Sequence, residues 1–304
     1  MNAPDRRVLA AFVAAVVVGG TNPVAIRYSN DELPPFGGAA IRFAAAALLF
    51  AAYAAARRQP FPRGRALAGT IFFGVLNFAG VYGFIYWGLQ RAPAALGSTY
   101  FALVPLVTVF FAAAHGLERI RLRGVLGSAV AVVGVAVIFA EKLGSDVALP
   151  YQLALLAAAI CAAESLVVVK LLPRIAGPAL NAVGMAAGAV VLIALALAAG
   201  EAPPAPHLAA TWLALGYLIV TSLALFALLL YVIRRWTVTA ASYGAVLFPV
   251  VTVAVAAALR GEGVSPLFIA GAAIVGVGVY VGALSRPAAR PVAATPSPSE
   301  AHLR

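Results

Sequence analysis

The chain has 304 residues, of which 63% are hydrophobic and only 10% are charged, and its mean hydropathy is +1.00. This composition excludes the soluble globular class and is typical of a chain embedded in lipid. The formal net charge of +11 would indicate nucleic acid in a soluble protein. Here the basic residues stand in short turns between apolar runs, where they orient membrane helices. We therefore expect a lipid bilayer as partner, and no nucleic acid.

Apolar runs of about 20 residues, the length that crosses a bilayer as a helix, recur along the chain. They are rich in Ala, Leu and Gly and do not alternate with polar residues, which favours helices over barrel strands. The first run follows two arginines as a signal peptide would, but it continues through Asn22 and Pro23, so we expect it to be retained. The ten predicted spans are Val8–Ile26, Phe36–Ala56, Leu67–Leu89, Ala94–Ala114, Leu122–Ala140, Tyr151–Leu172, Ala179–Ala199, Thr211–Ile233, Thr239–Leu259 and Pro266–Leu284.

Two stretches of the chain, 92–139 and 237–282, are nearly the same sequence. A shift of 144 residues places Ser98 on Ser242, Pro105 on Pro249, Thr108 on Thr252, Glu118 on Glu262, Gly127 on Gly271 and Gly134 on Gly278. Each copy holds two spans joined by a polar turn, so the repeated unit is membrane-embedded. Because five spans per repeat is an odd number, the second copy must enter the membrane from the opposite side. The sequence predicts an all-α integral membrane fold of ten transmembrane helices in two inverted five-helix repeats.

The division expected from this pattern is a first repeat at 1–146, a second at 147–286 and a disordered cytoplasmic tail at 287–304, which is rich in Pro, Ala and Ser. Counting Lys and Arg on the two sides of the predicted spans gives sixteen on the side of the N-terminus and four on the other. Positive charge is enriched in cytoplasmic turns, so both termini are predicted to be cytoplasmic.

The chain resembles the EamA-type transporters of the drug/metabolite transporter superfamily over nearly its whole length except the tail. The resemblance is carried by GGTNPVAIR at the end of the first span, PPFGGAAIRF at the start of the second, and the repeated unit that contains Pro105 and GLERIRLRG. It implies ten helices in two inverted halves and the export of small metabolites or drugs through a central cavity. At an offset of 143 residues Pro178 matches Pro35, but Met185 stands where Arg42 does.

Glu164 is the most informative candidate for the substrate site. It lies about 13 residues into its predicted span, or roughly 20 Å deep, past the centre of the membrane core. A carboxylate there is costly, so it should face the bundle interior, either protonated or paired. We expect it to bind a substrate amine or carry a proton; a buried carboxyl that makes one interhelical hydrogen bond is the alternative.

Five further residues are predicted to line the substrate site. Arg42 lies about 9 Å below the outer end of its helix, where it either extends to the interface as an anchor or pairs with Glu164. Asn77 needs a hydrogen-bond partner in the membrane, either another helix or the cavity. The remaining three are Ser165, Tyr82 and Tyr100, the two tyrosines having deep rings with polar tips.

Pro105 and Pro249 are predicted to be matched hinges, because each removes a backbone hydrogen bond in mid-helix at equivalent places in the two repeats. Simple packing kinks are the alternative. The repeated glycines are expected to allow close helix packing. His115 is expected to be solvated at a helix end, and Glu118 to be a cap or a partner of nearby arginines.

The sequence contains no nucleotide-hydrolysis, hydrolase or metal motif, so no cofactor and no metal are expected. It predicts a secondary transporter, not an enzyme, that exports a small polar or amphipathic molecule such as an amino acid, amine or drug-like compound across the bacterial inner membrane. Coupling to protons, and a monomer or a homodimer, are left open. A non-transporting scaffold or sensor is the alternative, and a lipid-modifying membrane enzyme is a more distant one.

Overall fold

The computed structural model describes residues 5–89, 91–92, 94–140, 147–202, 205–260 and 265–284. Helices joined by turns and loops make up these ranges, and no strand is present in them. The predicted tail after residue 286 and the loop residue Glu262 lie outside the described ranges.

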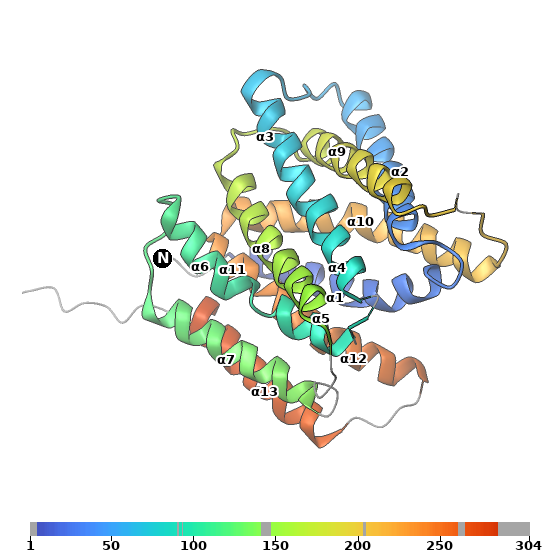
Figure 1. The fold of residues 1–304 in the computed structure, drawn as a ribbon. Helices are drawn as coiled ribbons and strands as arrows, with labels where there is room; N and C mark the ends of the chain where they lie inside the picture. Colours follow the sequence, from blue (N-terminus) through green and yellow to red (C-terminus); the bar gives the residue numbers. More distant parts are fainter. Residues whose placement is uncertain are drawn as a thin grey trace, which may run out of the picture.

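The helices follow the predicted spans closely (Figure 1). In the first half they are α1 (Arg6–Ser29), α2 (Pro35–Ala56), α3 (Gly64–Gly74), a π-helical segment η1 (Val75–Gly80), α4 (Val81–Leu89), α5 (Ala94–Phe101), α6 (Val104–Ala114) and α7 (Leu122–Ile138). In the second half they are α8 (Leu149–Leu171), α9 (Gly177–Ala198), α10 (Ala209–Arg235), α11 (Val238–Ser242), α12 (Gly244–Arg260), α13 (Pro266–Val279) and a second π-helical segment η3 (Tyr280–Leu284).

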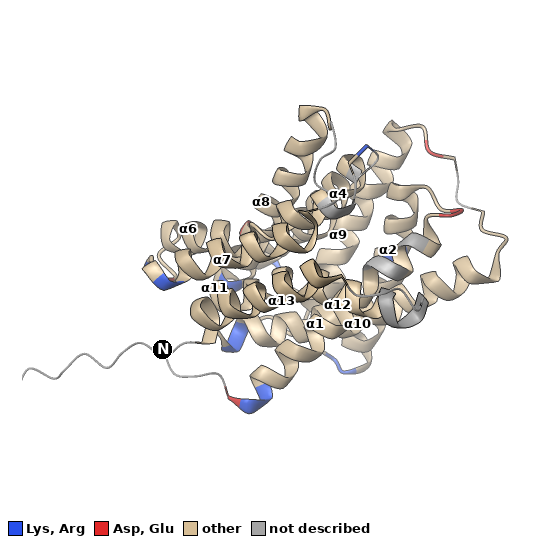
Figure 2. Ribbon diagram, turned by 90° about the horizontal axis from the view of Figure 1, so that it is seen from below, with Lys and Arg blue, Asp and Glu red and all other residues tan. Residues whose placement is uncertain are grey.

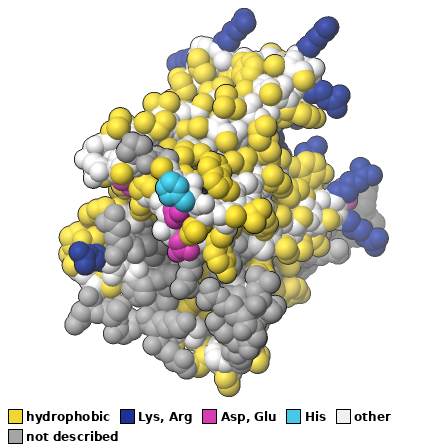
Figure 3. Space-filling model, turned by 90° about the vertical axis from the view of Figure 1, so that its right-hand side faces the viewer, with side chains coloured by type: hydrophobic (Ala, Val, Ile, Leu, Met, Phe, Trp, Pro, Cys, Tyr) yellow, Lys and Arg dark blue, Asp and Glu magenta, His cyan; other side chains and the backbone are white. Residues whose placement is uncertain are grey.

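Eight helical segments in the described part of the chain are long and apolar enough to cross a membrane. α7 is a shorter apolar helix of 17 residues, and the 24 residues of α1 give it the length of a span. Large apolar side chains such as Leu48, Leu197 and Leu213 are more than 70% exposed, and hydrophobic side chains cover much of the face shown in Figure 3, with Lys and Arg at its edges. Such a surface is stable only against lipid, so the protein is a multi-pass membrane protein.

Local sequence explains where several of these helices begin and end. Five helices carry a proline in the first turn, where its missing N–H costs no hydrogen bond: α2, α6, α8, α9 and α13. α6 and α9 are each followed by a glycine with positive φ, Gly116 at 71° and Gly200 at 68°. Only glycine adopts this left-handed conformation without strain, so these two residues end their helices.

Glycines bring α7 and α13 into direct backbone contact. A Cβ placed on Gly127 would lie 2.8 Å from the carbonyl oxygen of Gly278, and one on Gly134 would lie 2.9 Å from that of Gly271. The predicted role of these glycines in close packing is confirmed. The contact partners run in opposite directions along the two helices, so α7 and α13, which are equivalent helices of the two repeats, are antiparallel. The two halves therefore cross the membrane in opposite senses.

The other contacts between the halves come in equivalent pairs. α1 packs on α10 as α8 packs on α4, and α1 packs on α12 as α8 packs on α6. α2 and α9, themselves equivalent, lie side by side (Figure 1). This is the arrangement of two similar units related by an approximate two-fold axis, and it confirms the predicted two-repeat architecture.

Basic residues in the described ranges lie mainly at helix ends and in turns (Figure 2). Those at the turns α2–α3, α6–α7, α8–α9 and α10–α11 are Arg57, Arg58, Arg63, Arg119, Arg121, Arg174 and Arg235. The opposite turns α1–α2, α4–α5 and α9–α10 contain Asp31, Glu32 and Glu201, with Arg91 as the one basic residue among their described residues. The two faces of the bundle thus differ in charge.

Candidate functional site

Arg42 is buried at the contact between the two halves. Its side chain is 2% exposed, and its Nε donates a hydrogen bond to the Ser222 hydroxyl on α10 at 2.7 Å. The guanidinium carbon lies 5.2 Å from the ring centre of Phe43 and 5.6 Å from that of Tyr82. The side chain does not extend to the interface, and its hydrogen bond goes to Ser222 instead of Glu164. That Arg42 takes part in the substrate site stays a prediction.

Asn77 and Ser165 join the third span of the first half to the first span of the second. Ser165 Oγ lies 3.0 Å from Asn77 Oδ1 and 2.7 Å from the carbonyl oxygen of Ala162. Asn77 belongs to η1, and single π-helical turns of this kind occur often at functional sites. The structure therefore gives Asn77 the interhelical partner that its amide requires.

An equivalent hydrogen bond exists on the other side of the approximate two-fold axis. Thr221 Oγ1 donates to Asn22 Oδ1 at 2.8 Å, and both residues are buried. An offset of 143 takes Asn22 to Ser165, and an offset of 144 takes Asn77 to Thr221. The two polar pairs thus occupy equivalent positions. The amide is on the third span in the pair Asn77–Ser165 and on the first span of its half in the pair Asn22–Thr221.

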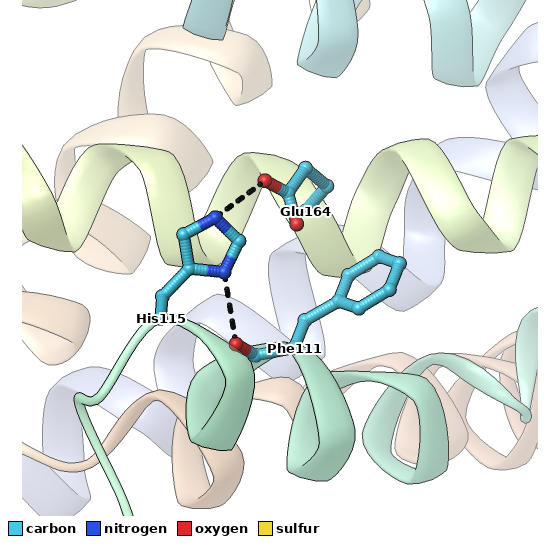
Figure 4. A network of polar contacts seen from close by, with 3 residues as sticks. All are labelled: Phe111, His115 and Glu164. Carbon is cyan, nitrogen blue, oxygen red and sulfur yellow. Dashed lines mark hydrogen bonds and ion pairs between the residues drawn. The ribbon is translucent and has the colours of Figure 1, made fainter.

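Glu164 contacts His115 at the end of α6 (Figure 4). Its Oε1 lies 3.3 Å from His115 Nε2, and the side chains are 21% and 38% exposed. Glu164 stands seven residues before Leu171, about 10 Å from that end of α8. His115, expected to be solvated without a partner, is the residue that faces Glu164.

His115 is positioned by a second contact on its own helix. Its Nδ1 lies 3.0 Å from the carbonyl oxygen of Phe111, one turn earlier in α6. The other ring nitrogen, Nε2, therefore faces the Glu164 carboxyl group (Figure 4).

The two candidate tyrosines occupy different surroundings. Tyr82 packs edge-on against Phe43 with ring centres 4.8 Å apart, beside Arg42. Tyr100 donates a hydrogen bond to Gln152 Oε1 at 2.8 Å, joining α5 to α8. The predicted residues therefore form separate polar groups along α8 and α2 instead of one cluster.

The equivalent prolines have different local structure. Pro105 lies in the first turn of α6, after a break in the helix at residues 102–103. Pro249 lies inside α12, six residues after the junction with α11 at Tyr243. The span Leu96–Ala114 is thus interrupted near its middle, just before Pro105, whereas α12 continues through Pro249. That the two prolines act as matched hinges stays a prediction.

Carboxylates bind backbone amides across the contact between the halves. Glu32 in the α1–α2 turn accepts hydrogen bonds from the Leu208 amide and the Thr211 hydroxyl at the start of α10, at 2.9 and 2.6 Å. The Thr211 hydrogen bond is the main reason why the pKa of Glu32 is lowered. Glu201 in the α9–α10 turn accepts from the amides of Phe36 and Gly37 at the start of α2, at 3.0 and 2.8 Å. Both bonds lie on the same face of the bundle.

On the opposite face, Glu118 accepts hydrogen bonds from the amides of Val238 and Thr239 at the start of α11. This confirms the interpretation of Glu118 as a cap, although the helix that it caps belongs to the other half. The residues that sequence reasoning missed are the partners: His115, Ser222, Asn22, Thr221, Gln152, Glu32 and Glu201. The chain distance between partners exceeds 45 residues in every pair, so no local pattern could have paired them.

Groups of three or more His, Cys, Asp or Glu side chains that could hold a metal ion are absent from the described ranges. The polar groups on α2, α8 and α10 can instead bind and orient a small molecule by hydrogen bonds and charge.

Comparison with known families decides the class of the protein. The model of the EamA-like transporter family matches residues 6–140 and again residues 149–283, one match for each half. The chain belongs to the EamA-like transporter family. The two matched ranges correspond to the two sets of helices that the structure relates by symmetry.

Similar EamA-like proteins include an uncharacterized inner membrane transporter YedA of Escherichia coli K12, 28% identical over 84% of each chain. A probable terminal-alkyne amino-acid exporter of Streptantibioticus cattleyicolor is 28% identical over 89% of this chain and 91% of its own. A probable amino-acid metabolite efflux pump of Salmonella typhimurium is 27% identical over 88% and 91%. A solved crystal structure with 22% identity superposes with a TM-score of 0.77, covering 90% of this chain and 97% of its own, and has the same fold.

Proposed function

We propose that this EamA-like protein is a secondary transporter that exports a small polar or amphipathic metabolite across the bacterial inner membrane by alternating access. The substrates that fit are amino acids, amines or drug-like compounds. Support comes from the family and from the names of the relatives, which include an inner membrane transporter, an exporter and an efflux pump.

The observation that carries the proposal is the antiparallel packing of equivalent helices α7 and α13. Two similar units in opposite orientations have two nearly equivalent arrangements, one open to each side of the membrane. The polar pairs Asn77–Ser165 and Asn22–Thr221 lie where the halves meet, which is where inverted-repeat transporters bind substrate.

The proposed topology has both termini in the cytoplasm, because the face with most arginines is then the cytoplasmic one. The bonds of Glu32 and Glu201 would close the outer face, and those of Glu118 would join the halves on the inner face. Export requires these two sets to break in turn. The first repeat is proposed to end near residue 146.

Glu164 is the proposed proton carrier, together with His115. The proposed proton site lies close to the cytoplasmic end of α8 in this topology. A molecule bearing an amine could replace that proton by binding the carboxylate directly, which would couple export to proton uptake.

Two experiments test the proposal. Cells that overexpress the protein are grown on toxic amino acids, amine compounds and drugs, and protection by efflux is measured against cells with the empty vector. Single cysteines introduced at Arg63 and Arg234 are then labelled with an impermeant reagent, and both must react from the cytoplasmic side. Labelling from opposite sides would refute the inverted topology, and absence of protection and efflux for every compound would favour the scaffold or sensor alternative.

A further inference from the structure

The guanidinium of Arg42 is buried with four of its five N–H donors unpaired. Nη1 and Nη2 are both inaccessible, and neither has a hydrogen-bond partner in the described part of the protein. Nε alone is satisfied, by Ser222. A buried charge with unpaired donors is costly, so such a group calls for a compensating ligand.

The residues around Arg42 do not supply a counter-charge. Its contacts are the rings of Phe43 and Tyr82 and the hydroxyl of Ser222. Cation–π contact of this kind offsets about 2 kcal/mol when desolvated, which is less than the cost of an uncompensated buried ion. No carboxylate forms an ion pair with Arg42 in the described ranges.

The second repeat shows that the fold does not need a charge at this position. At an offset of 143 the residue equivalent to Arg42 is Met185, which is fully buried in the apolar core. At an offset of 144 the equivalent of Ser222 is Phe78, also fully buried. The same packing site is therefore filled by apolar side chains in one half and by an arginine and its serine in the other. Packing at this position therefore does not require a charge.

The charged side chain of Arg42 lies in the region that alternating access would rearrange. Arg42 is on α2 and Ser222 is on α10, and these helices belong to different halves. The same two helices are bound at their starts by Glu201 and Glu32. Separation of α2 from α10 would release the Ser222 bond and expose Nη1 and Nη2 to whatever enters between the halves.

We propose that Arg42 is the anchor for a carboxylate of the transported molecule, with Tyr82 and Phe43 facing the adjacent apolar part. This inference rests on the proposed transport function and specifies its substrate as a small carboxylic acid or amino acid. The planar guanidinium presents two parallel N–H groups that match both oxygens of a carboxylate. An amide in place of the carboxylate loses the charge and half of this match.

The test uses the full chain, purified in detergent, and pairs of compounds that differ only at the carboxylate. Binding of L-phenylalanine and L-phenylalaninamide, of L-leucine and L-leucinamide, and of benzoate and benzamide is measured by ligand-induced stabilisation. The acid is expected to bind more tightly than its amide in at least one pair. In Arg42→Met, which copies the second repeat, affinity for that acid should fall about tenfold or more, as expected for hydrogen bonds to a charged group, and affinity for the amide should stay within about twofold.

Arg42→Lys and Ser222→Ala distinguish the anchor from a structural role. Lysine keeps the charge without the planar fork, so acid affinity should be intermediate, while Ser222→Ala should keep the preference for the acid. Equal binding of acid and amide by the wild type in all pairs, or a preference that survives in Arg42→Met, overturns the proposal. If Arg42→Met does not fold, unchanged acid affinity in Arg42→Lys overturns it. Efflux of amides and amines without acid preference would refute the anchor alone, whereas acid binding without efflux of any compound would refute the transporter.

Discussion

His115 Nε2 and Glu164 Oε1 lie 3.3 Å apart across the contact between α6 and α8. His115 Nδ1 also lies 3.0 Å from the Phe111 carbonyl oxygen, so the ring is held by its own helix with Nε2 toward the carboxyl group. Separation of α6 from α8 would part the two side chains.

We predict that Glu164→Gln abolishes the response of transport to a pH gradient. Glutamine keeps the size and a hydrogen bond to His115 but cannot exchange a proton. In proteoliposomes, a one-proton carrier driven by one pH unit accumulates substrate up to about tenfold, and the variant should show no gradient-driven accumulation. Asp31→Asn, an exposed acid outside the spans, is the control and should behave as the wild type. Gradient-driven accumulation that persists in Glu164→Gln would remove this residue from the mechanism.

We predict that the glycines between α7 and α13 are required for stability. A Cβ on Gly134 would lie 2.7 Å from the Val275 nitrogen, so Gly134→Ala must push the two backbones apart. Overpacking of this kind costs about 1 to 3 kcal/mol, and the apparent Tm in detergent should fall by several degrees. Gly276→Ala on α13 is the matched control, because its Cβ would meet nothing within 4 Å; it should be neutral or slightly stabilising. Equal Tm values for the two variants would contradict this account of the contact.

The helices could be predicted from the sequence because each span is a long uniform apolar run, and the inversion followed from the 144-residue repeat combined with five spans per copy. Gly127 and Gly134 were recognisable because they recur at Gly271 and Gly278. Their contact partners were not, since the sequence does not show that the two equivalent helices pack against each other.

The site was less predictable. A polar residue in a membrane span requires a hydrogen-bond partner, but the sequence does not identify that partner. Glu164 was singled out by its depth, but its partner is at the end of a different helix. Arg42 was interpreted from its distance to the helix end, whereas its burial is set by α4 and α10, which close over it. The different places of Pro105 and Pro249 in their helices likewise depend on where each helix breaks, which equivalent sequences did not show.

We predict that the contact made by Glu32 disappears in acid. The hydrogen bond from Thr211 lowers the pKa of Glu32 below its ordinary value of 4.5 in the folded protein. A lowered folded-state pKa stabilises the fold fully above the ordinary value, and this stabilisation is lost as the pH falls through the lowered value. The apparent Tm of Glu32→Gln should therefore lie below that of the wild type at pH 6, and the two should converge toward pH 3. A difference that stays constant across this range would show that the carboxylate charge does not contribute.

We predict that Pro249→Ala slows transport and that Pro105→Ala does not. Pro249 lies inside α12, where it leaves the Ala245 carbonyl without its helical donor. The neighbouring hydroxyl of Thr252 lies 2.7 Å from the Gly20 carbonyl on α1, so this weakened part of α12 is in contact with the other half. Alanine restores the missing hydrogen bond and stabilises the straight helix by up to about 3 kcal/mol.

If half of that energy opposes the bending of α12 during transport, the rate falls about tenfold. Pro105 provides the matched control, because it stands in the first turn of α6 and its replacement restores no hydrogen bond. Initial rates and substrate affinity are measured for both variants in proteoliposomes, with affinity expected to stay within about twofold of the wild type. Equal slowing by both substitutions would favour matched hinges, and wild-type rates in both would leave Pro249 as a packing kink.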